Sequence, residues 1–235
     1  MDGNTFLDFA GGIGTVNVGH ARFEDAGLEQ LATLKSLQKL SLMGTKVTDG
    51  GLKHLRGLTE LQELWLDGTA VSDAGLEELF TLKKLKTLYV RGTRVTTAGA
   101  LRAAAALPNT DLAFTHGSRD ATGVTLLAGV QDGDLAALSE VPKLLVLRVY
   151  DAPINDAGLT HIAALSDLQW LTINGGKFTA AGLKSLSALK KLVMLSLNRT
   201  PLGDEGLKTI SEMPQLRELY VTHCNVTNEG ASQLK

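Results

Sequence analysis

The sequence predicts an α/β repeat solenoid in which short parallel strands and short helices alternate along the chain. Three consecutive stretches of 24 residues, 37–60, 61–84 and 85–108, share apolar residues at positions 1, 4, 6, 11, 19 and 22 and glycine at position 15. Self-similarity at a fixed period of 20–50 residues indicates a repeat architecture, in which each unit buries its apolar side only against its neighbours. The 235-residue chain is therefore expected to have one continuous core.

Each repeat is expected to fold as a strand, a turn, a short helix and a return. Residues at positions 4 and 6 point to one face of the strand, whereas those at positions 5 and 7 point to the other. A hydroxyl at position 9, as in Thr45, can bond the backbone of the turn. We predict that position 13 is the helix N-cap, because it precedes the apolar run of the helix. Most copies have an aspartate or asparagine there: Asp25, Asp49, Asp73, Asp132, Asp156, Asp204 and Asn228.

The pattern LxxLxLxGTxVTDAGLxxLxxLxx resembles the leucine-rich repeat, in the 24-residue form that is common in bacterial proteins. The resemblance covers residues 13–235, and it is closer to the ribonuclease-inhibitor-like and cysteine-containing members than to those with an asparagine ladder. It implies a horseshoe-shaped solenoid with a concave parallel β-sheet and short convex helices. It also implies that the concave face binds another macromolecule, although the repeat type alone names no partner.

The regular pattern breaks near residues 109–120. This segment keeps apolar residues at Leu112 and Phe114, as a strand would, but continues as HGSRD instead of a cap and a helix. We predict a truncated repeat made of a strand and a loop, or alternatively an inserted loop.

The break divides the chain into parts of one continuous solenoid. The expected parts are a cap segment at residues 1–12, a first sub-array at 13–116 and a second sub-array at 117–235. Phe6, Leu7 and Phe9 are expected to cover the open end of the first repeat. The last repeat stops within its helix, so we expect that the natural chain continues past Lys235 or that a partner or a neighbouring copy covers the open strand edge.

Composition excludes several classes of function. The formal net charge of −2 does not favour a nucleic-acid or anionic-membrane surface, because such surfaces need an excess of Lys and Arg. The sequence has no run of about 18 apolar residues, as a membrane span requires, and its start lacks the pattern of a secretory signal. The single cysteine, Cys224, excludes an internal disulfide framework. We therefore expect a cytoplasmic protein.

The aromatic residues with a polar group gather on one face of the predicted sheet. Positions 3, 5 and 7 of the repeats point to the concave side, and they hold both tryptophans and all three tyrosines, whereas the phenylalanines lie at other positions. Tyr and Trp are enriched at the centres of protein interfaces. Aromatic residues also favour strands in general, so they could cover the sheet without binding anything.

We predict a partner-binding surface that consists of two patches on this face. Trp65 and Tyr89 are expected to touch, because adjacent strands lie about 4.8 Å apart. A second patch is expected around Arg148, with Tyr150 and Trp170. The mixed charges of the face suit a protein or peptide partner better than a sugar or a phosphate chain. The predicted partner-binding residues are Met43, Trp65, Asp67, Tyr89, Arg91, Arg148, Tyr150, Trp170 and Tyr220.

Other candidate sites have simpler explanations. His20, His116 and His223 share position 8, but they are four or more repeats apart, roughly 20 Å at the spacing of strands, which is too far for a shared zinc ion. Cys224 is expected to be a buried structural thiol at position 9. The loop at 116–120 is expected to be a plain linker, with a functional insertion as the alternative.

No catalytic set of side chains converges at matched positions of adjacent repeats, and the predicted face is open to water. We therefore expect no enzyme, no cofactor and no metal site. The first hypothesis is a non-enzymatic protein- or peptide-binding module. The alternatives are a structural or self-assembling scaffold and the recognition domain of a larger enzyme or effector. The sequence leaves the oligomeric state open.

Overall fold

The structure, a computed structural model, describes residues 12–115, 117–120, 123–232 and 234. The chain forms two compact units, Met1–Ala121 and Thr122–Lys235. Phe6, Leu7 and Phe9, which were expected to cap the first repeat, lie outside the described residues.

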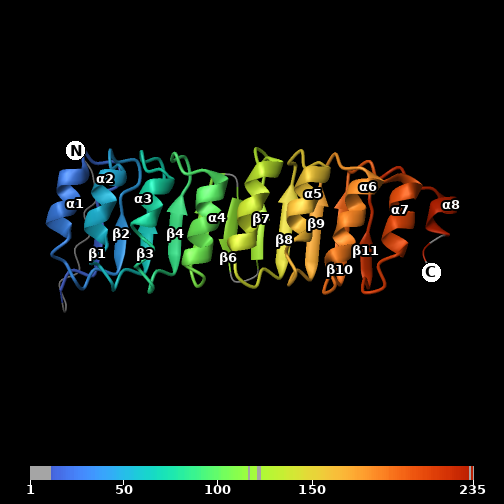
Figure 1. Cartoon of the computed structure of the whole chain (residues 1–235). Coiled ribbons are helices and arrows are strands. Elements are labelled where there is room, and N and C mark those ends of the chain that lie inside the picture. The colour runs from blue at the N-terminus through green and yellow to red at the C-terminus, as the bar shows by residue number, and fades with distance from the viewer. Residues whose placement is uncertain (1–11, 116, 121–122, 233, 235) are drawn as a thin grey trace. The chain divides into compact units, whose positions relative to one another are not determined.

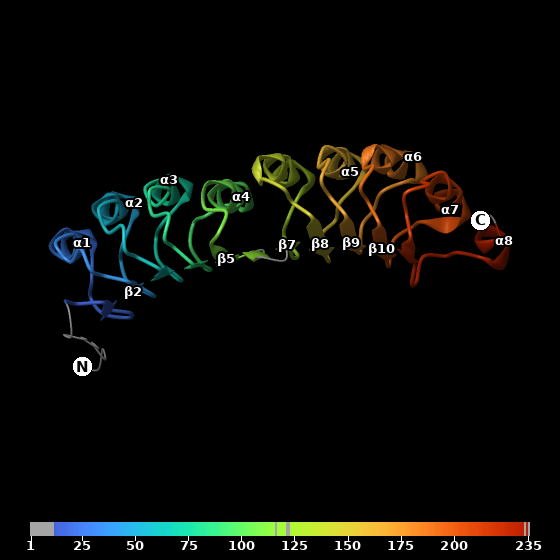
Figure 2. The ribbon, with the colours of Figure 1, turned by 90° about the horizontal axis from the view of Figure 1, so that it is seen from below.

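In the first unit, strands and helices alternate, and the helices lie on one side of the sheet (Figures 1 and 2). The strands pair in chain order, and all described pairs before the last are parallel. The strands are β1 (Thr15–Asn17), β2 (Lys39–Ser41), β3 (Glu63–Trp65), β4 (Thr87–Val90), β5 (Asp111–Phe114) and β6 (Gly117–Asp120). The helices are α1 (Asp25–Leu31), α2 (Asp49–Leu52), the 3₁₀ turn η1 (Lys53–Leu55), α3 (Asp73–Glu77) and α4 (Thr97–Ala106).

The second unit repeats this arrangement with a parallel sheet throughout. Its strands are β7 (Gly123–Leu126), β8 (Val146–Tyr150), β9 (Trp170–Asn174), β10 (Met194–Asn198) and β11 (Glu218–Tyr220). Its helices are the 3₁₀ helix η2 (Asp132–Glu140), α5 (Asp156–Ala163), α6 (Ala180–Leu183), the 3₁₀ helix η3 (Lys184–Ala188), α7 (Gly203–Ser211) and α8 (Asn228–Ala231). Facing residues on neighbouring strands are 24 apart from β8 to β11, as in Val146, Trp170, Met194 and Glu218.

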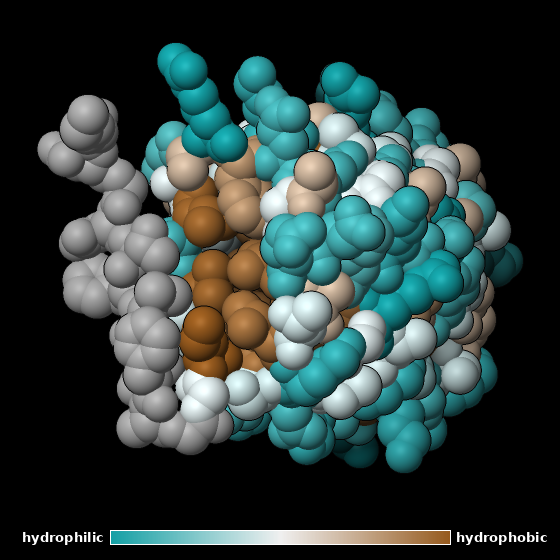
Figure 3. Space-filling view, turned by 90° about the vertical axis from the view of Figure 1, so that its left-hand side faces the viewer, coloured by the Kyte–Doolittle hydropathy of each residue, from teal (hydrophilic) through white to brown (hydrophobic). Residues whose placement is uncertain are grey.

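The core lies between the sheet and the helices of each unit, as the apolar periodicity predicts. Leu40, Leu64 and Leu88 at position 4 are buried, and so are the apolar residues at positions 1, 6 and 11 of the regular repeats. Burying a leucine side chain contributes about 1.5–3 kcal/mol, and each copy adds several such residues to the core that it shares with its neighbours. At the outer end of the first repeat, Ile13 and Phe23 are only half-buried, and Figure 3 shows an apolar surface at this end.

The irregular segment at 109–120 forms a hairpin rather than a strand and a loop. β6 pairs antiparallel with β5, and the pairs Ala113–Ser118 and Phe114–Gly117 place small residues opposite apolar ones. Arg119 donates a hydrogen bond of 3.1 Å from Nη1 to the carbonyl of Thr110. The predicted loop at 116–120 is therefore wrong for residues 117–120. An antiparallel strand can pair with β5 after a tight turn, whereas a parallel strand would need a longer crossover connection.

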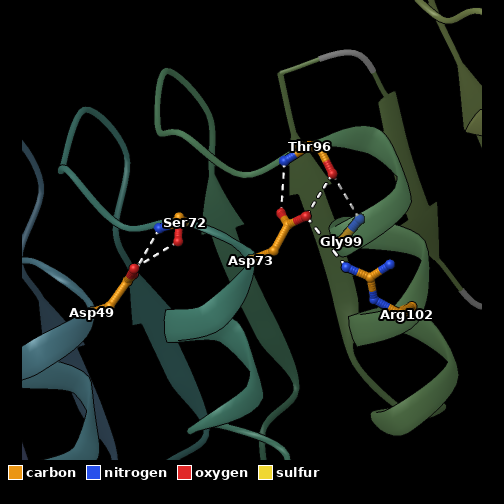
Figure 4. A network of polar contacts seen from close by, with 6 residues as sticks. All are labelled: Asp49, Ser72, Asp73, Thr96, Gly99 and Arg102. Carbon is orange, nitrogen blue, oxygen red and sulfur yellow. Dashed lines mark hydrogen bonds and ion pairs between the residues drawn. The ribbon is translucent and has the colours of Figure 1, made fainter.

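The prediction that the aspartate at position 13 is the helix N-cap is wrong. This aspartate lies inside its helix, as the first residue of α2 or the second of α7, and the N-cap precedes the helix, for example Thr48, whose Oγ1 accepts a hydrogen bond from Gly50 N. The carboxylate instead reaches the N-cap of the next repeat. Asp49 accepts hydrogen bonds from the backbone N–H and the hydroxyl of Ser72 at 2.7 and 2.6 Å (Figure 4).

Six such carboxylates connect neighbouring repeats, and we call this set the aspartate ladder. Each accepts the backbone N–H of the next N-cap at 2.7–3.0 Å, and five also accept its hydroxyl at 2.6–2.7 Å. Its pairs are Asp25–Thr48, Asp49–Ser72, Asp73–Thr96, Asp132–Asn155, Asp156–Thr179 and Asp204–Thr227. A negative charge at a helix N-terminus is also favoured by the helix dipole.

The ladder explains the glycine at position 15. A Cβ atom on Gly182 would lie 2.1 Å from Oδ1 of Asp156, and the equivalent glycines of the other ladder repeats leave 2.0–2.4 Å. A side chain at this position would therefore displace the carboxylate of the preceding repeat. Where position 13 is Ala180, the ladder has no carboxylate, and a Cβ on Gly206 would meet Leu202 instead.

We predict that Gly182→Ala lowers the free energy of unfolding by about 1–3 kcal/mol, because the new methyl group displaces Asp156. In an Asp156→Gly background, which removes the carboxylate together with the Asp156 Cβ that would lie 2.9 Å from the new methyl carbon, the same change should cost nothing or should stabilise by up to about 1 kcal/mol, because alanine favours helices more than glycine does. Urea denaturation of the double-mutant cycle measures this coupling. Gly133→Ala is the control, since its Cβ would meet nothing within 4 Å. An equal cost of Gly182→Ala in both backgrounds contradicts the ladder.

The lowered pKa values of two carboxyls predict how the stability of the fold depends on pH. Hydrogen bonds from the backbone N–H and then the hydroxyl of Thr227 lower the pKa of Asp204, and a hydrogen bond from Lys191 lowers the pKa of Asp167. A carboxyl with a lowered pKa stabilises the fold above its unfolded-state pKa of about 3.9 and loses that contribution as the pH falls through the lowered value.

We therefore expect the stability difference between the wild type and Asp204→Asn to be constant above about pH 4 and to shrink below it. Thermal denaturation from pH 3 to pH 7 measures this difference, with Glu212→Gln on the exposed surface as a charge-matched control. A difference that does not change with pH would falsify the role of the ionised Asp204.

Candidate functional site

The exposed sheet face of the first unit carries a stacked aromatic pair. Trp65 on β3 and Tyr89 on β4 are directly paired, and their rings are nearly parallel, with 6.2 Å between the centroids and 4° between the planes. Their neighbours along each strand, Leu64 and Leu88, are buried in the core, so the two rings lie on the opposite face of the sheet. The predicted contact between Trp65 and Tyr89 is confirmed.

A shallow hollow lies on the side of Trp65 that faces β1 and β2. Its volume is about 310 Å³. The sequence predicted Met43 and Trp65 as part of the site but missed the small residues of β1 and β2 that leave this space open. Residues of three successive strands line the hollow: Thr15, Val16, Asn17, Lys39, Ser41, Met43 and Trp65.

Two acids of this face, Glu63 and Asp67, bind groups on neighbouring repeats. Lys39 and Glu63 form an ion pair of 2.7 Å on neighbouring strands. Asp67 accepts a hydrogen bond of 2.7 Å from the backbone N–H of Arg91, which leaves the Arg91 side chain exposed beside Tyr89. The predicted residues of the first unit therefore form one surface, with aromatic rings at the centre and charges around them.

In the second unit the strand register separates two residues that were predicted to share a patch. Trp170 at the start of β9 faces Val146 and Met194, whereas Tyr150 at the end of β8 faces Asn174. Four residues of strand, roughly 13 Å, separate the two aromatic positions. The prediction of one patch around Tyr150 and Trp170 is therefore wrong in this respect, and Arg148 lies between them on the same face.

Tyr220 occupies the last strand of this unit. Its side chain is 54% exposed, and its hydroxyl donates a hydrogen bond of 3.2 Å to Glu218 on the same strand. Tyr220 faces Ser196 of β10, so it lies three strands away from Arg148 along the same row.

The structure adds an apolar row that the sequence analysis overlooked. Val146, Trp170 and Met194 face one another on β8, β9 and β10, and Trp170 is 48% exposed. Position 3 holds Lys, Glu or Thr in the regular repeats of the first unit but apolar residues here, so a comparison of this position between repeats could have revealed the row. We define the apolar row as Val146, Trp170 and Met194.

The remaining candidates have structural roles. Cys224 is buried, and its Sγ contacts the carbonyl of Leu197 at 2.7 Å and the hydroxyl of Thr200 at 3.5 Å. His20 and His223 occupy the turn after a strand with positive φ, at the position where four other repeats have a glycine, as in Gly44 and Gly68. Among the described residues, no group of three His, Cys, Asp or Glu side chains could hold a metal ion. Within the same residues, no helix combines the length and apolarity needed to cross a bilayer.

Comparisons with known proteins agree with the repeat pattern in two places. The sequence profile of the family described as "Leucine Rich repeat" matches residues 33–55 and 213–235. A search of curated proteins finds no match.

Several solved structures are similar in fold. Internalin C2 from Listeria monocytogenes is 22% identical with a TM-score of 0.43, and the alignment covers 89% of this chain and 81% of the internalin. An internalin (inlF) from the same species is 18% identical with a TM-score of 0.42, with 95% and 85% covered.

The ectodomain of the Arabidopsis thaliana receptor kinase GASSHO1/SCHENGEN3, solved in complex with CASPARIAN STRIP INTEGRITY FACTOR 2, is 15% identical with a TM-score of 0.41. The alignment covers 98% of this chain but 27% of that one. The 24-residue strand register and the buried leucine positions show the fold of a leucine-rich repeat solenoid, and two of its segments match the family profile.

Proposed function

We propose that this chain is a non-enzymatic module that binds a protein or peptide through the exposed faces of its sheets. The observation that carries the proposal is the stacked pair of Trp65 and Tyr89 beside a hollow of about 310 Å³. Few positions on a folded protein present two large aromatic rings side by side on an open face, and such residues carry most of the binding energy at interfaces.

The stack favours binding because it is already ordered. Each ring restricts its neighbour, so a partner that packs on them loses less side-chain freedom than it would on long flexible side chains. The hollow next to Trp65 lies at the lower end of the usual range for ligand pockets, about 300–1,000 Å³. It suits one apolar side chain of a partner, with Lys39 and Asn17 available at its rim.

The same surface argues against catalysis. On the first sheet face, Lys39 is held in an ion pair with Glu63, and Asp67 accepts the backbone N–H of Arg91. An open, shallow surface also cannot exclude water from a reaction. A binding surface explains these features without a reaction.

We extend the proposal to the type of repeat and to the cellular compartment. We assign the repeats to the bacterial 24-residue type, because the regular copies carry the GT-x-VTDAGL pattern. We also propose that the protein acts in the cytoplasm, where a buried thiol such as Cys224 stays reduced.

Photo-crosslinking tests the proposal. The photoreactive residue p-benzoylphenylalanine replaces Tyr89 on the sheet face in one variant and Lys53, an exposed residue of η1, in another. In a lysate of the source organism, we expect a protein adduct from the Tyr89 position and none of that size from Lys53. Wild-type chain added as a competitor should suppress the adduct.

The double variant Trp65→Ala with Tyr89→Ala is the matched competitor. We expect it to compete about 30-fold less well than the wild type, because loss of a binding hot spot costs 2 kcal/mol or more. Its circular dichroism should match the wild type, since both side chains are only half-buried. Adducts from Lys53 alone, or adducts between copies of this chain alone, contradict the proposal, and the second result supports a self-assembling scaffold.

A further inference from the structure

The sheet face of the second unit carries a cation that nothing around it neutralises. Arg148 on β8 faces Thr125 of β7 and Thr172 of β9, so the three side chains form one row across three adjacent strands. We call this row the Arg148 row. Among the described residues, Arg148 has no ion pair, and neither threonine hydroxyl has a hydrogen-bond partner.

On the first sheet face, by contrast, each described Lys or Arg at positions 3, 5 and 7 has an acid at the same position of the neighbouring repeat. Lys39 forms an ion pair with Glu63, and Arg91 lies next to Asp67, which accepts its backbone N–H. At the face-directed positions 3, 5 and 7 of the second unit, the described residues include a single acid, Glu218. It lies on β11, three strands from Arg148, and it already accepts a hydrogen bond from Tyr220.

Apolar side chains border the Arg148 row on one side. In the apolar row, Val146 and Trp170 are each two residues before Arg148 and Thr172 on the same strands. Trp170 in this row is 48% exposed. A guanidinium with two hydroxyls next to an exposed tryptophan therefore offers a polar and an apolar contact within one or two residues of each other.

We infer that the Arg148 row binds the carboxylate of a peptide that also places an apolar side chain on the apolar row. The inference rests on the proposed function, since it names the kind of partner that the second sheet face takes. A guanidinium binds a carboxylate through two parallel hydrogen bonds, and the flanking hydroxyls can donate to the same group.

The charge of the site selects a carboxylate over a phosphate. A phosphorylated side chain carries about −1.5 to −2 charges at neutral pH and is bound by clusters of arginines. Arg148 is the single Lys or Arg among the described residues at positions 3, 5 and 7 of this unit. One positive charge matches one carboxylate, and the neighbouring apolar row matches a Leu, Ile or Phe side chain next to it in sequence.

The test uses the whole chain and a random 12-residue peptide library displayed on phage. We expect the selected peptides to be enriched in Asp or Glu within two residues of a large apolar side chain. A synthetic peptide from the most frequent clone is then titrated against Trp65→Phe, in which Trp170 is the remaining tryptophan and reports on binding by its fluorescence.

Arg148→Gln should weaken this peptide about 10- to 100-fold, as expected for the loss of a charge-assisted hydrogen bond. The Asn or Gln version of the peptide should bind the unchanged protein equally weakly. Lys184→Gln, which removes a charge from the exposed side of η3, should leave the affinity unchanged. Arg148→Lys should restore part of the loss, because it keeps the charge but not the paired donors.

Several results would overturn the inference. These are no enrichment of acidic residues, an affinity that Arg148→Gln does not change, and tighter binding of a phosphoserine version of the peptide. Peptides that still bind the Arg148→Gln variant but no longer bind the double variant Trp65→Ala with Tyr89→Ala would also overturn it. That result would support the proposed function on the first unit. Peptides that depend on neither variant contradict both.

Discussion

The interaction on which the structure depends is the bond between an aspartate and the helix N-cap of the next repeat. A repeat of one short strand and one short helix has no core of its own, and apolar contacts between repeats are not directional. Asp49 fixes the relation between its helix and the next by taking both the N–H and the hydroxyl of Ser72. Since charge-assisted hydrogen bonds have a defined geometry, each ladder step sets the position of the following helix.

This arrangement leaves the sheet face free. The apolar positions of each repeat are used by the core, and positions 9, 13 and 15 are used by the turn and the ladder, as Thr69, Asp49 and Gly75 illustrate. Positions 3 and 5 satisfy no such requirement, because the backbone of each strand bonds its neighbours whatever the side chains are. Trp65 and Arg148 are therefore explained by what they present to solvent and not by what they stabilise.

Much of the fold follows from the sequence because the repeats agree with one another. The period predicts the strand register, and the buried Leu40, Leu64 and Leu88 confirm the apolar positions. The role of the aspartate could not be found in one repeat, since its partner lies 23 residues away and a local pattern indicates only a cap. The hairpin at 117–120 was missed because GSR has no strand pattern, and pairing with β5 decides its structure.

The arrangement of side chains in the candidate sites could also be predicted from the sequence only in part. The stack of Trp65 and Tyr89 was predictable because adjacent repeats place equal positions side by side. The separation of Tyr150 from Trp170 and the isolation of Arg148 depend on which neighbours each row has, and a single repeat does not contain them. The two units use one backbone plan but present different chemistry, a stacked aromatic pair with cations next to acids in the first and a guanidinium without a neighbouring acid beside apolar side chains in the second. We therefore propose a different contact for each face.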